Sequence, residues 1–98
     1  MEEGLYIYCI IESEEPSSFD IQGIGGRGDK VYTISLDNIG AVVSVSPIKR
    51  YSVARENLMA HERVIEEVMK THTVLPVRFA TITESEEKIR MILLLIFF

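Results

Sequence analysis

The sequence predicts a single α+β domain in which an antiparallel sheet is covered on one face by one main helix. Residues 5–11 form a run of aromatic and β-branched residues without Gly or Pro, which is typical of a central strand covered on both faces. Two further apolar runs, 31–36 and 39–45, flank an Asp-Asn pair, and this pattern indicates a β-hairpin. Residues 52–71 carry apolar side chains spaced by threes and fours, which predicts an amphipathic helix packed on the sheet.

The segment between the first strand and the hairpin is predicted to be a loop. Residues 12–28 gather acids, serines, Pro16 and four glycines, which either stay solvated or permit positive φ angles. At most one helical turn fits there, near residues 17–21. The hairpin is expected to end at Ser46-Pro47, because proline cannot donate a hydrogen bond to a strand ladder.

The predicted helix over residues 52–71 has Ser52 available as its N-cap. Its apolar stripe includes His61, so we expect this ring to face the sheet and to be buried. The opposite face is charged and is expected to be solvated. The stripe consists of Ala54, Leu58, His61, Ile65 and Val68, and the charged face of Arg55, Glu56, Glu62, Arg63, Glu66, Glu67 and Lys70.

A fourth strand is predicted over residues 73–83. Pro76 lies inside it, which places this strand at a sheet edge or beside a bulge. Arg78 alternates with its apolar neighbours and is therefore expected to leave the core side. We expect a carboxylate from residues 12–15 to lie beside it.

The end of the chain reads as a helix start followed by a fully apolar run. Thr and Ser residues within 83–87 can cap a helix, and the acids there suit the positive end of its dipole. Residues 91–98 are all apolar and need cover from the second sheet face, an edge strand or the same segment of a second copy. We therefore expect a domain over 1–90, a truncated apolar element over 91–98, and a homo-oligomer formed through Met91 to Phe98.

Composition excludes several classes of protein. At 98 residues the chain holds one core, and a net charge of −5 lacks the positive field that gathers phosphate backbones, so no nucleic acid is expected as a partner. Cys9 lies in an apolar run and predicts a buried thiol in a reducing compartment. The N-terminus has no basic signal region, and no apolar run reaches the ~20 residues that cross a bilayer. We expect a cytoplasmic protein without a membrane span.

Two motifs match catalytic or binding signatures only in part. Residues 23–28 have the letters of the nucleotide-binding G-x-G-x-x-G pattern, but a loop precedes them and a strand follows, where the fingerprint needs a strand and then a helix. His61-Glu62 begins like a zinc-protease motif, but Ile65 stands where the second histidine is required. The remaining histidine and the single cysteine do not complete a set of four ligands. We expect no catalytic residue, cofactor or metal.

Four basic residues are candidates for contacting a partner. They surround the proline turn and the start of the predicted helix, and only Tyr51 adds an aromatic ring among them. This pattern favours a polar protein contact over RNA readout. The candidates are Lys49, Arg50, Arg55 and Arg78.

Residues 4–10 read Gly-Leu-Tyr-Ile-Tyr-Cys-Ile, and His61 is followed by Val-Leu-Pro-Val-Arg-Phe-Ala-Thr at residues 74–81. These two stretches, of which the second is the more specific, resemble the GvpF/GvpL gas-vesicle family. The order of elements is similar over almost the whole chain. Ala80 departs from the family's usual glycine, so we expect no positive φ angle there.

The resemblance implies a ferredoxin-like N-terminal domain whose first helix is reduced to a loop. It also implies a non-enzymatic accessory role in gas vesicle assembly, with the shell protein GvpA and other gas-vesicle proteins as partners. A shell subunit that exposes apolar surface before assembly needs such a cover. Two other classes stay open, a small-ligand-binding regulatory module of ferredoxin-like fold and an enzyme.

The predicted core draws on every expected strand and on the helix. Its members are Leu5, Ile7, Cys9, Ile11, Val31, Ile34, Ala41, Val43, Ala54, Leu58, Ile65, Val68, Leu75, Val77 and Phe79.

Overall fold

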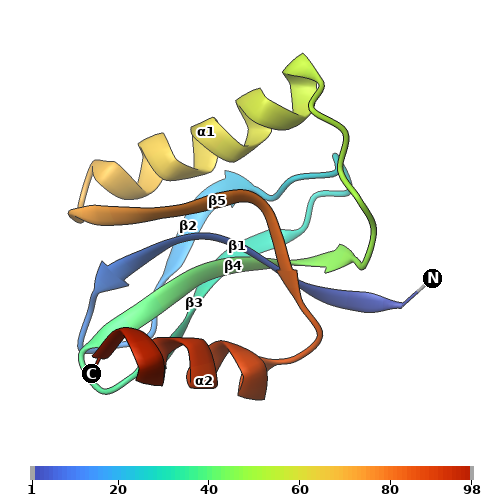
Figure 1. Ribbon diagram of the computed structural model, residues 1–98. Helices are drawn as coiled ribbons and strands as arrows, with labels where there is room; N and C mark the ends of the chain where they lie inside the picture. Colours follow the sequence, from blue (N-terminus) through green and yellow to red (C-terminus); the bar gives the residue numbers. More distant parts are fainter. Residues whose placement is uncertain (1, 98) are drawn as a thin grey trace.

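The computed structural model describes residues 2–97, without the side chain of Phe97. Five strands form one antiparallel sheet in the order β2-β3-β4-β1-β5. Figure 1 shows this sheet between two helices, α1 over one face and α2 over the other. The elements are β1 (Glu3–Glu12), β2 (Ser18–Gln22), β3 (Lys30–Leu36), β4 (Ile39–Pro47), α1 (Arg55–Met69), β5 (Val74–Thr83) and α2 (Glu86–Phe97).

The α+β class is confirmed, but the placement of one main helix on one face is wrong. Helix α2 covers the second face, where Ile89 and Leu93 are fully buried against β3 and β4. Ser85 caps this helix by accepting a hydrogen bond from the backbone N–H of Lys88 at 3.3 Å. Residues 91–97 of the predicted apolar run continue the same helix, and residue 98 lies outside the described residues. A ferredoxin-like topology is not confirmed.

Strand β1 is the centre of the sheet, as its composition predicts. It lies between β4 and β5, and residues 4–11 are all buried. A bulge between Ile7 and Cys9 changes the alternation, so Tyr8 and Cys9 both pack on the α1 side while Ile7 and Ile10 pack on the α2 side. Bulges shift which face a strand's side chains occupy.

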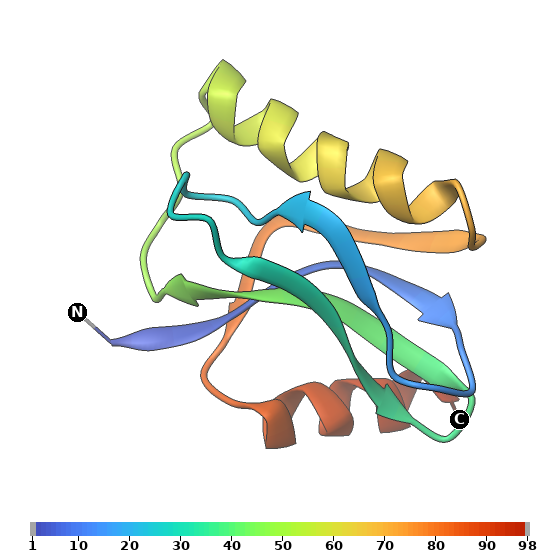
Figure 2. The same cartoon turned by 180° about the vertical axis from the view of Figure 1, so that it is seen from behind.

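The prediction of a loop over residues 12–28 is wrong in part, because β2 lies within it. Ser18 and Phe19 pair with Tyr32 and Val31 of β3, and Phe19 and Ile21 pack against the core on the α1 side. Figure 2 shows β2 as the outer strand beneath α1. A five-residue strand with two half-buried apolar residues gives only a weak periodic signal.

The hairpin and the edge strand are confirmed. Strands β3 and β4 pair around the Asp37-Asn38 turn, where Asp37 has a φ angle of 52°, and β4 ends at Pro47. Strand β5 is an edge strand, and its Pro76 lies opposite Cys9 at the bulge of β1. The register of β5 jumps from Pro76 to Thr81 at the same place, so residues 77–80 are unpaired, and we call them the bulge of β5.

Helix α1 begins three residues later than its predicted N-cap. Ala54 occupies the N-cap position without a side-chain hydrogen bond, and Ser52 instead accepts a hydrogen bond from the side-chain amide of Asn57 at 3.3 Å. Ser52 is therefore not the cap. Among residues 2–97, no helix is long and apolar enough to cross a membrane.

The predicted core is confirmed on β1, β3 and β4 and in part elsewhere. Leu58 and Leu75 are wrong, because 38% and 57% of their surfaces are exposed. On α1 the buried side chains begin only at His61 and include Val64 in place of Leu58, since the first turns of the helix border open hollows. Ala54, Val77 and Phe79 are half-buried.

Candidate protein-binding surface

The hydroxyl of Tyr6 joins three elements inside the molecule. It accepts a hydrogen bond from the backbone N–H of Ala80 on β5 at 2.9 Å and lies 2.9 Å from Nδ1 of His61 on α1. Because the hydroxyl already accepts from Ala80, we assign it as the donor of the hydrogen bond to Nδ1 of His61, whose ring is then neutral with its proton on Nε2. Burial raises the pKa of Tyr6 to about 12 and lowers the pKa of His61.

His61 is 5% exposed, so its predicted burial is confirmed. Its ring packs among those of Tyr6, Tyr8 and Phe79. The histidine therefore ties helix α1 to the strand segment that carries Arg78. Residues 2–97 contain no group of three or more side chains that could hold a metal ion.

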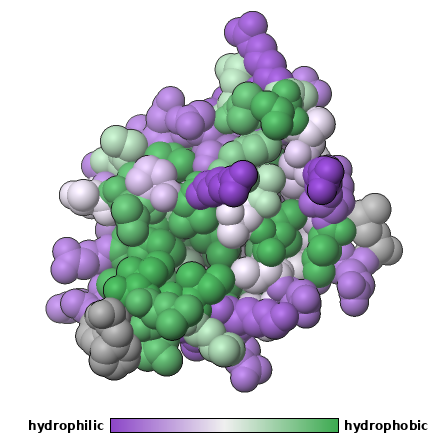
Figure 3. Space-filling view, in the orientation of Figure 1, coloured by the Kyte–Doolittle hydropathy of each residue, from purple (hydrophilic) through white to green (hydrophobic). Residues whose placement is uncertain are grey.

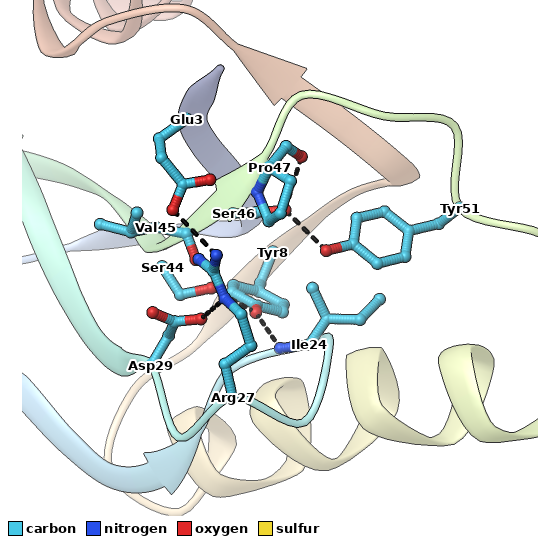
Figure 4. A network of polar contacts seen from close by, with 10 residues as sticks. All are labelled: Glu3, Tyr8, Ile24, Arg27, Asp29, Ser44, Val45, Ser46, Pro47 and Tyr51. Carbon is cyan, nitrogen blue, oxygen red and sulfur yellow. Dashed lines mark hydrogen bonds and ion pairs between the residues drawn. The ribbon is translucent and has the colours of Figure 1, made fainter. Parts of the chain in front are cut away.

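Tyr8 holds the glycine-rich loop between β2 and β3. Its hydroxyl lies 2.7 Å from Oγ of Ser44 and accepts a hydrogen bond from the backbone N–H of Ile24 at 2.8 Å, as Figure 4 shows. Arg27 closes the loop through ion pairs with Glu3 and Asp29 at 2.9 and 2.8 Å. Strand β3 follows the glycines, where a nucleotide site would need a helix.

Tyr51 fixes the linker between β4 and α1. Its hydroxyl lies 2.6 Å from Oγ of Ser46, visible in Figure 4, and its ring is buried. The ammonium group of Lys49 lies 4.7 Å from the centre of this ring, within the range of a cation–π contact. The three tyrosines thus anchor the bulge of β5, the glycine-rich loop and the linker.

The four predicted contact residues lie on or beside these anchored segments, and all are exposed. Lys49 and Arg50 lie on the linker, Arg78 lies in the bulge of β5, and Arg55 is the first residue of α1. Arg63 joins them from the face of α1 that the sequence predicts to be solvated. We call these five residues, Lys49, Arg50, Arg55, Arg63 and Arg78, the basic surface.

Three hollows run along the basic surface and share residues. Arg78, Arg50 and Lys49 line a hollow of about 540 Å³, and Lys49 and Arg63 line a second of about 600 Å³. Arg63 and Arg55 line a third of about 200 Å³. Lys49 thus borders the first and second, and Arg63 the second and third.

The cations of the basic surface have no ion-pair partner within residues 2–97. Of the ten Lys and Arg residues in the chain, four (Arg27, Lys70, Lys88 and Arg90) form ion pairs. Of the other six, only Lys30 lies outside the basic surface and its hollows. The predicted pairing of Arg78 with a carboxylate of residues 12–15 is absent among the ion pairs of residues 2–97, because the end of β1 lies beside the start of β5, where Ile11 pairs with Val74.

Sequence reasoning missed Arg63 and the role of the tyrosines. The helical spacing of Arg63 could have been recognised, since residues 56, 60 and 63 share one face at i, i+4 and i+7. The glycine-rich loop that completes the hollow, however, is far away in sequence. The contacts of Tyr6 and Tyr8 span 16 to 74 residues of sequence. Spacing along one element cannot show such pairs.

The expectation for Ala80 is wrong. Its φ angle is 66°, in the left-handed region that glycine adopts without strain. The bulge of β5 and the hydrogen bond from Ala80 to Tyr6 hold it there.

Curated relatives of this chain are gas vesicle proteins. It is 31% identical over 91 residues to gas vesicle protein F of Nostoc sp., covering 91% of this chain and 36% of that protein. It is 33% identical over 96 residues to gas vesicle protein F1 of Halobacterium salinarum, covering 95% of this chain and 44% of that protein. The chain therefore spans less than half the length of these relatives.

Solved structures give the same result at the level of the fold. The crystal structure of the gas vesicle protein GvpF from Anabaena sp. matches with a TM-score of 0.79 at 29% identity, over 98% of this chain and 39% of that one. GvpF from Microcystis aeruginosa matches with a TM-score of 0.78 at 28% identity, over 96% of this chain and 39% of that one. The family described as gas vesicle synthesis protein GvpL/GvpF matches residues 4–94, and this chain belongs to it.

Proposed function

We propose that the chain is a non-enzymatic accessory protein of gas vesicle assembly, which acts by binding the shell protein GvpA and other gas-vesicle proteins. The observation that carries the proposal is the family match over residues 4–94. The site of action would be the gas vesicle in the cytoplasm. The basic surface supports a binding role, because it is exposed, held in place by buried tyrosines and free of internal ion pairs among residues 2–97.

The chemistry of the buried groups favours binding over catalysis. Burial raises the pKa of Cys9 to about 12, so its thiol stays protonated and is a poor nucleophile. The Nδ1 atom of His61 already accepts from Tyr6, and the raised pKa of Tyr6 keeps that hydroxyl neutral. These groups serve packing and positioning.

Co-expression with GvpA followed by affinity pull-down tests the proposal. We expect the shell protein to be retained, and the variant Arg78→Ala to retain less of it while it folds normally, since removing an exposed, unpaired guanidinium orphans no buried group. Lys30→Ala is the matched control, because Lys30 is exposed and lines none of the three hollows. Equal retention by wild type and Arg78→Ala would contradict a contact at this surface, and no retention by wild type would contradict the proposed partner.

A small-ligand regulatory module is the second candidate, and one feature favours it. The hollow of about 600 Å³ between the glycine-rich loop, the linker and α1 has the size of ordinary ligand sites. Native mass spectrometry of the protein purified from its source organism would detect a retained small molecule. A bound ligand that Arg63→Ala releases would favour this candidate.

The proposal also includes a ferredoxin-like topology and a homo-oligomer. The strand order β3-β4-β1-β5, with α1 connecting β4 to β5, is compatible with a ferredoxin-like plan in which β2 replaces the first helix. The uncovered apolar side chains of α2 support a homo-oligomer.

A further inference from the structure

We propose that the basic surface binds an extended acidic segment of a partner protein, with carboxylates that pair with Lys49, Arg63 and their neighbours along the row of three adjacent hollows. This inference rests on the proposed binding function and names the chemistry of the partner. It identifies the ligand as a run of Asp or Glu side chains in an extended chain.

The unpaired cations of this acidic chain are concentrated on one surface. The chain has a net charge of −5, and yet five of its six cations without an ion pair among residues 2–97 lie together. Among residues 2–97, Glu56 is the single acid that lines the three hollows. An acidic segment is therefore attracted to this surface although the chain as a whole is negatively charged.

The shape of the basic surface suits an extended peptide. The three hollows are neighbours, because Lys49 borders the first and second and Arg63 borders the second and third. Cations spaced along a row of hollows match carboxylates spaced along an extended peptide, whereas a compact anion needs donors that converge on one point. Arginine suits this task, because its planar fork can bind a carboxylate through two parallel hydrogen bonds.

Buried tyrosines hold two segments of the basic surface in place. The hydroxyls of Tyr6 and Tyr51 hold the bulge of β5 and the linker by hydrogen bonds of 2.9 and 2.6 Å. The segments that carry Arg78 and Lys49 are thus ordered before a partner arrives. Such preorganisation lowers the entropy lost on binding.

A fluorescent peptide of eight glutamates provides the probe, with fluorescence anisotropy on the whole chain as the readout. We expect Lys49→Glu and Arg63→Glu each to weaken binding by about tenfold or more, since each turns an attraction into a repulsion. Lys30→Glu makes the same change of charge outside the three hollows and should weaken binding by less than about threefold. Raising the salt from about 0.05 M to about 0.5 M should also weaken binding, because the Debye length shortens.

Three results would overturn the inference. The first is unchanged peptide binding by Lys49→Glu and Arg63→Glu when both variants have a normal circular dichroism spectrum. The second is a loss of peptide binding in Lys30→Glu as large as in those variants, which would show an effect of net charge alone. The third is tighter binding of an eight-nucleotide oligothymidylate or of inorganic polyphosphate than of the peptide, which would show a phosphate site. If the peptide does not bind while the GvpA pull-down succeeds, the inference fails and the proposed function stands.

Discussion

The hydrogen bond between Tyr6 and His61 requires His61 to be neutral in the folded protein. Nδ1 of His61 accepts from the Tyr6 hydroxyl, which in turn accepts from Ala80. Protonation of the ring would remove this acceptor and place a charge among buried aromatic rings. Glu62 opposes the effect only in part, and the pKa of His61 is lowered, chiefly by burial.

We therefore expect stability to fall in mild acid. The unfolded chain binds a proton at His61 near pH 6.5, and the folded chain binds it only at lower pH, so the free energy of unfolding should decrease as the pH falls below about 6.5. The slope is at most about 1.4 kcal/mol per pH unit between the two pKa values. Urea denaturation between pH 8 and pH 5 measures it.

The control for this prediction is the second histidine. His61→Gln should flatten the pH dependence, whereas His72→Gln should keep it, because His72 lies in a half-exposed position in the turn between α1 and β5. A wild-type stability that stays constant from pH 7 to pH 5 would contradict the assignment of a neutral, buried His61.

A second prediction at this scale concerns Ala80, whose φ angle is 66°. A left-handed conformation costs a non-glycine residue roughly 1–2 kcal/mol, so Ala80→Gly should raise the free energy of unfolding by about 1 kcal/mol, after the greater freedom of glycine in the unfolded chain is subtracted. Ala60→Gly, inside helix α1, should instead lower it by about 1 kcal/mol. Chemical denaturation of both variants compares the signs, and a loss of stability in Ala80→Gly would contradict the strain.

The burial of His61 could be predicted from the sequence, whereas its partner could not. The spacing of apolar residues along α1 places the ring on the sheet side. Tyr6 is 55 residues away in sequence, and a strand covered on both faces gives no alternation to show which side a tyrosine takes. The bulge between Ile7 and Cys9 then changes that side within the strand.

At the scale of elements, β1, the hairpin, β5 and α1 could be predicted because each has a strong pattern of its own. Strand β2 could not, because it has five residues in a segment rich in acids and glycines. The sequence predicts only the start of helix α2. Its last two turns are apolar on every side, and a pattern without a polar face does not show which residues are buried. The sheet selects Ile89 and Leu93.

Helix α2 offers a prediction with a matched pair of neighbours. Leu93 is fully buried and Leu94 is 46% exposed. Leu93→Ala should lower the free energy of unfolding by about 2–5 kcal/mol, because it leaves a cavity between the helix and the sheet. Leu94→Ala should change it by less than about 1 kcal/mol. Thermal or chemical denaturation distinguishes them, and equal losses would contradict the packing of α2 on this face.

At the scale of the whole molecule, the two faces of the sheet support different surfaces, a basic one beside α1 and an apolar one on α2. The α1 side carries the buried tyrosines that anchor the basic surface. The α2 side ends in apolar side chains that the chain itself does not cover. Figure 3 shows apolar surface gathered over α2. The candidate contact residues could be named from the sequence one by one, but their assembly around three neighbouring hollows follows only from the fold.

The uncovered side of α2 predicts self-association. Met91 and Leu95 line a hollow of about 400 Å³ between α2 and the end of β5, and Leu95 is 79% exposed. Fully burying such a side chain is worth about 1.5–3 kcal/mol. A twofold pairing of two α2 helices would bury the apolar turns of both copies and leave the charged first turns, with the Glu84–Lys88 and Glu86–Arg90 pairs, at the periphery.

Sedimentation velocity over a range of protein concentrations measures this association. We expect the wild-type chain to show a dimer that Leu95→Glu dissociates, because the carboxylate would have to be buried without a partner. Val53→Glu is the matched control: Val53 is 80% exposed and lies outside α2, so it should leave the dimer intact. Substitution is preferable to deleting residues 91–98, since the deletion also removes the buried Leu93. A wild-type chain that stays monomeric at the highest concentration, or a dimer that both variants retain, would show that α2 is not the contact.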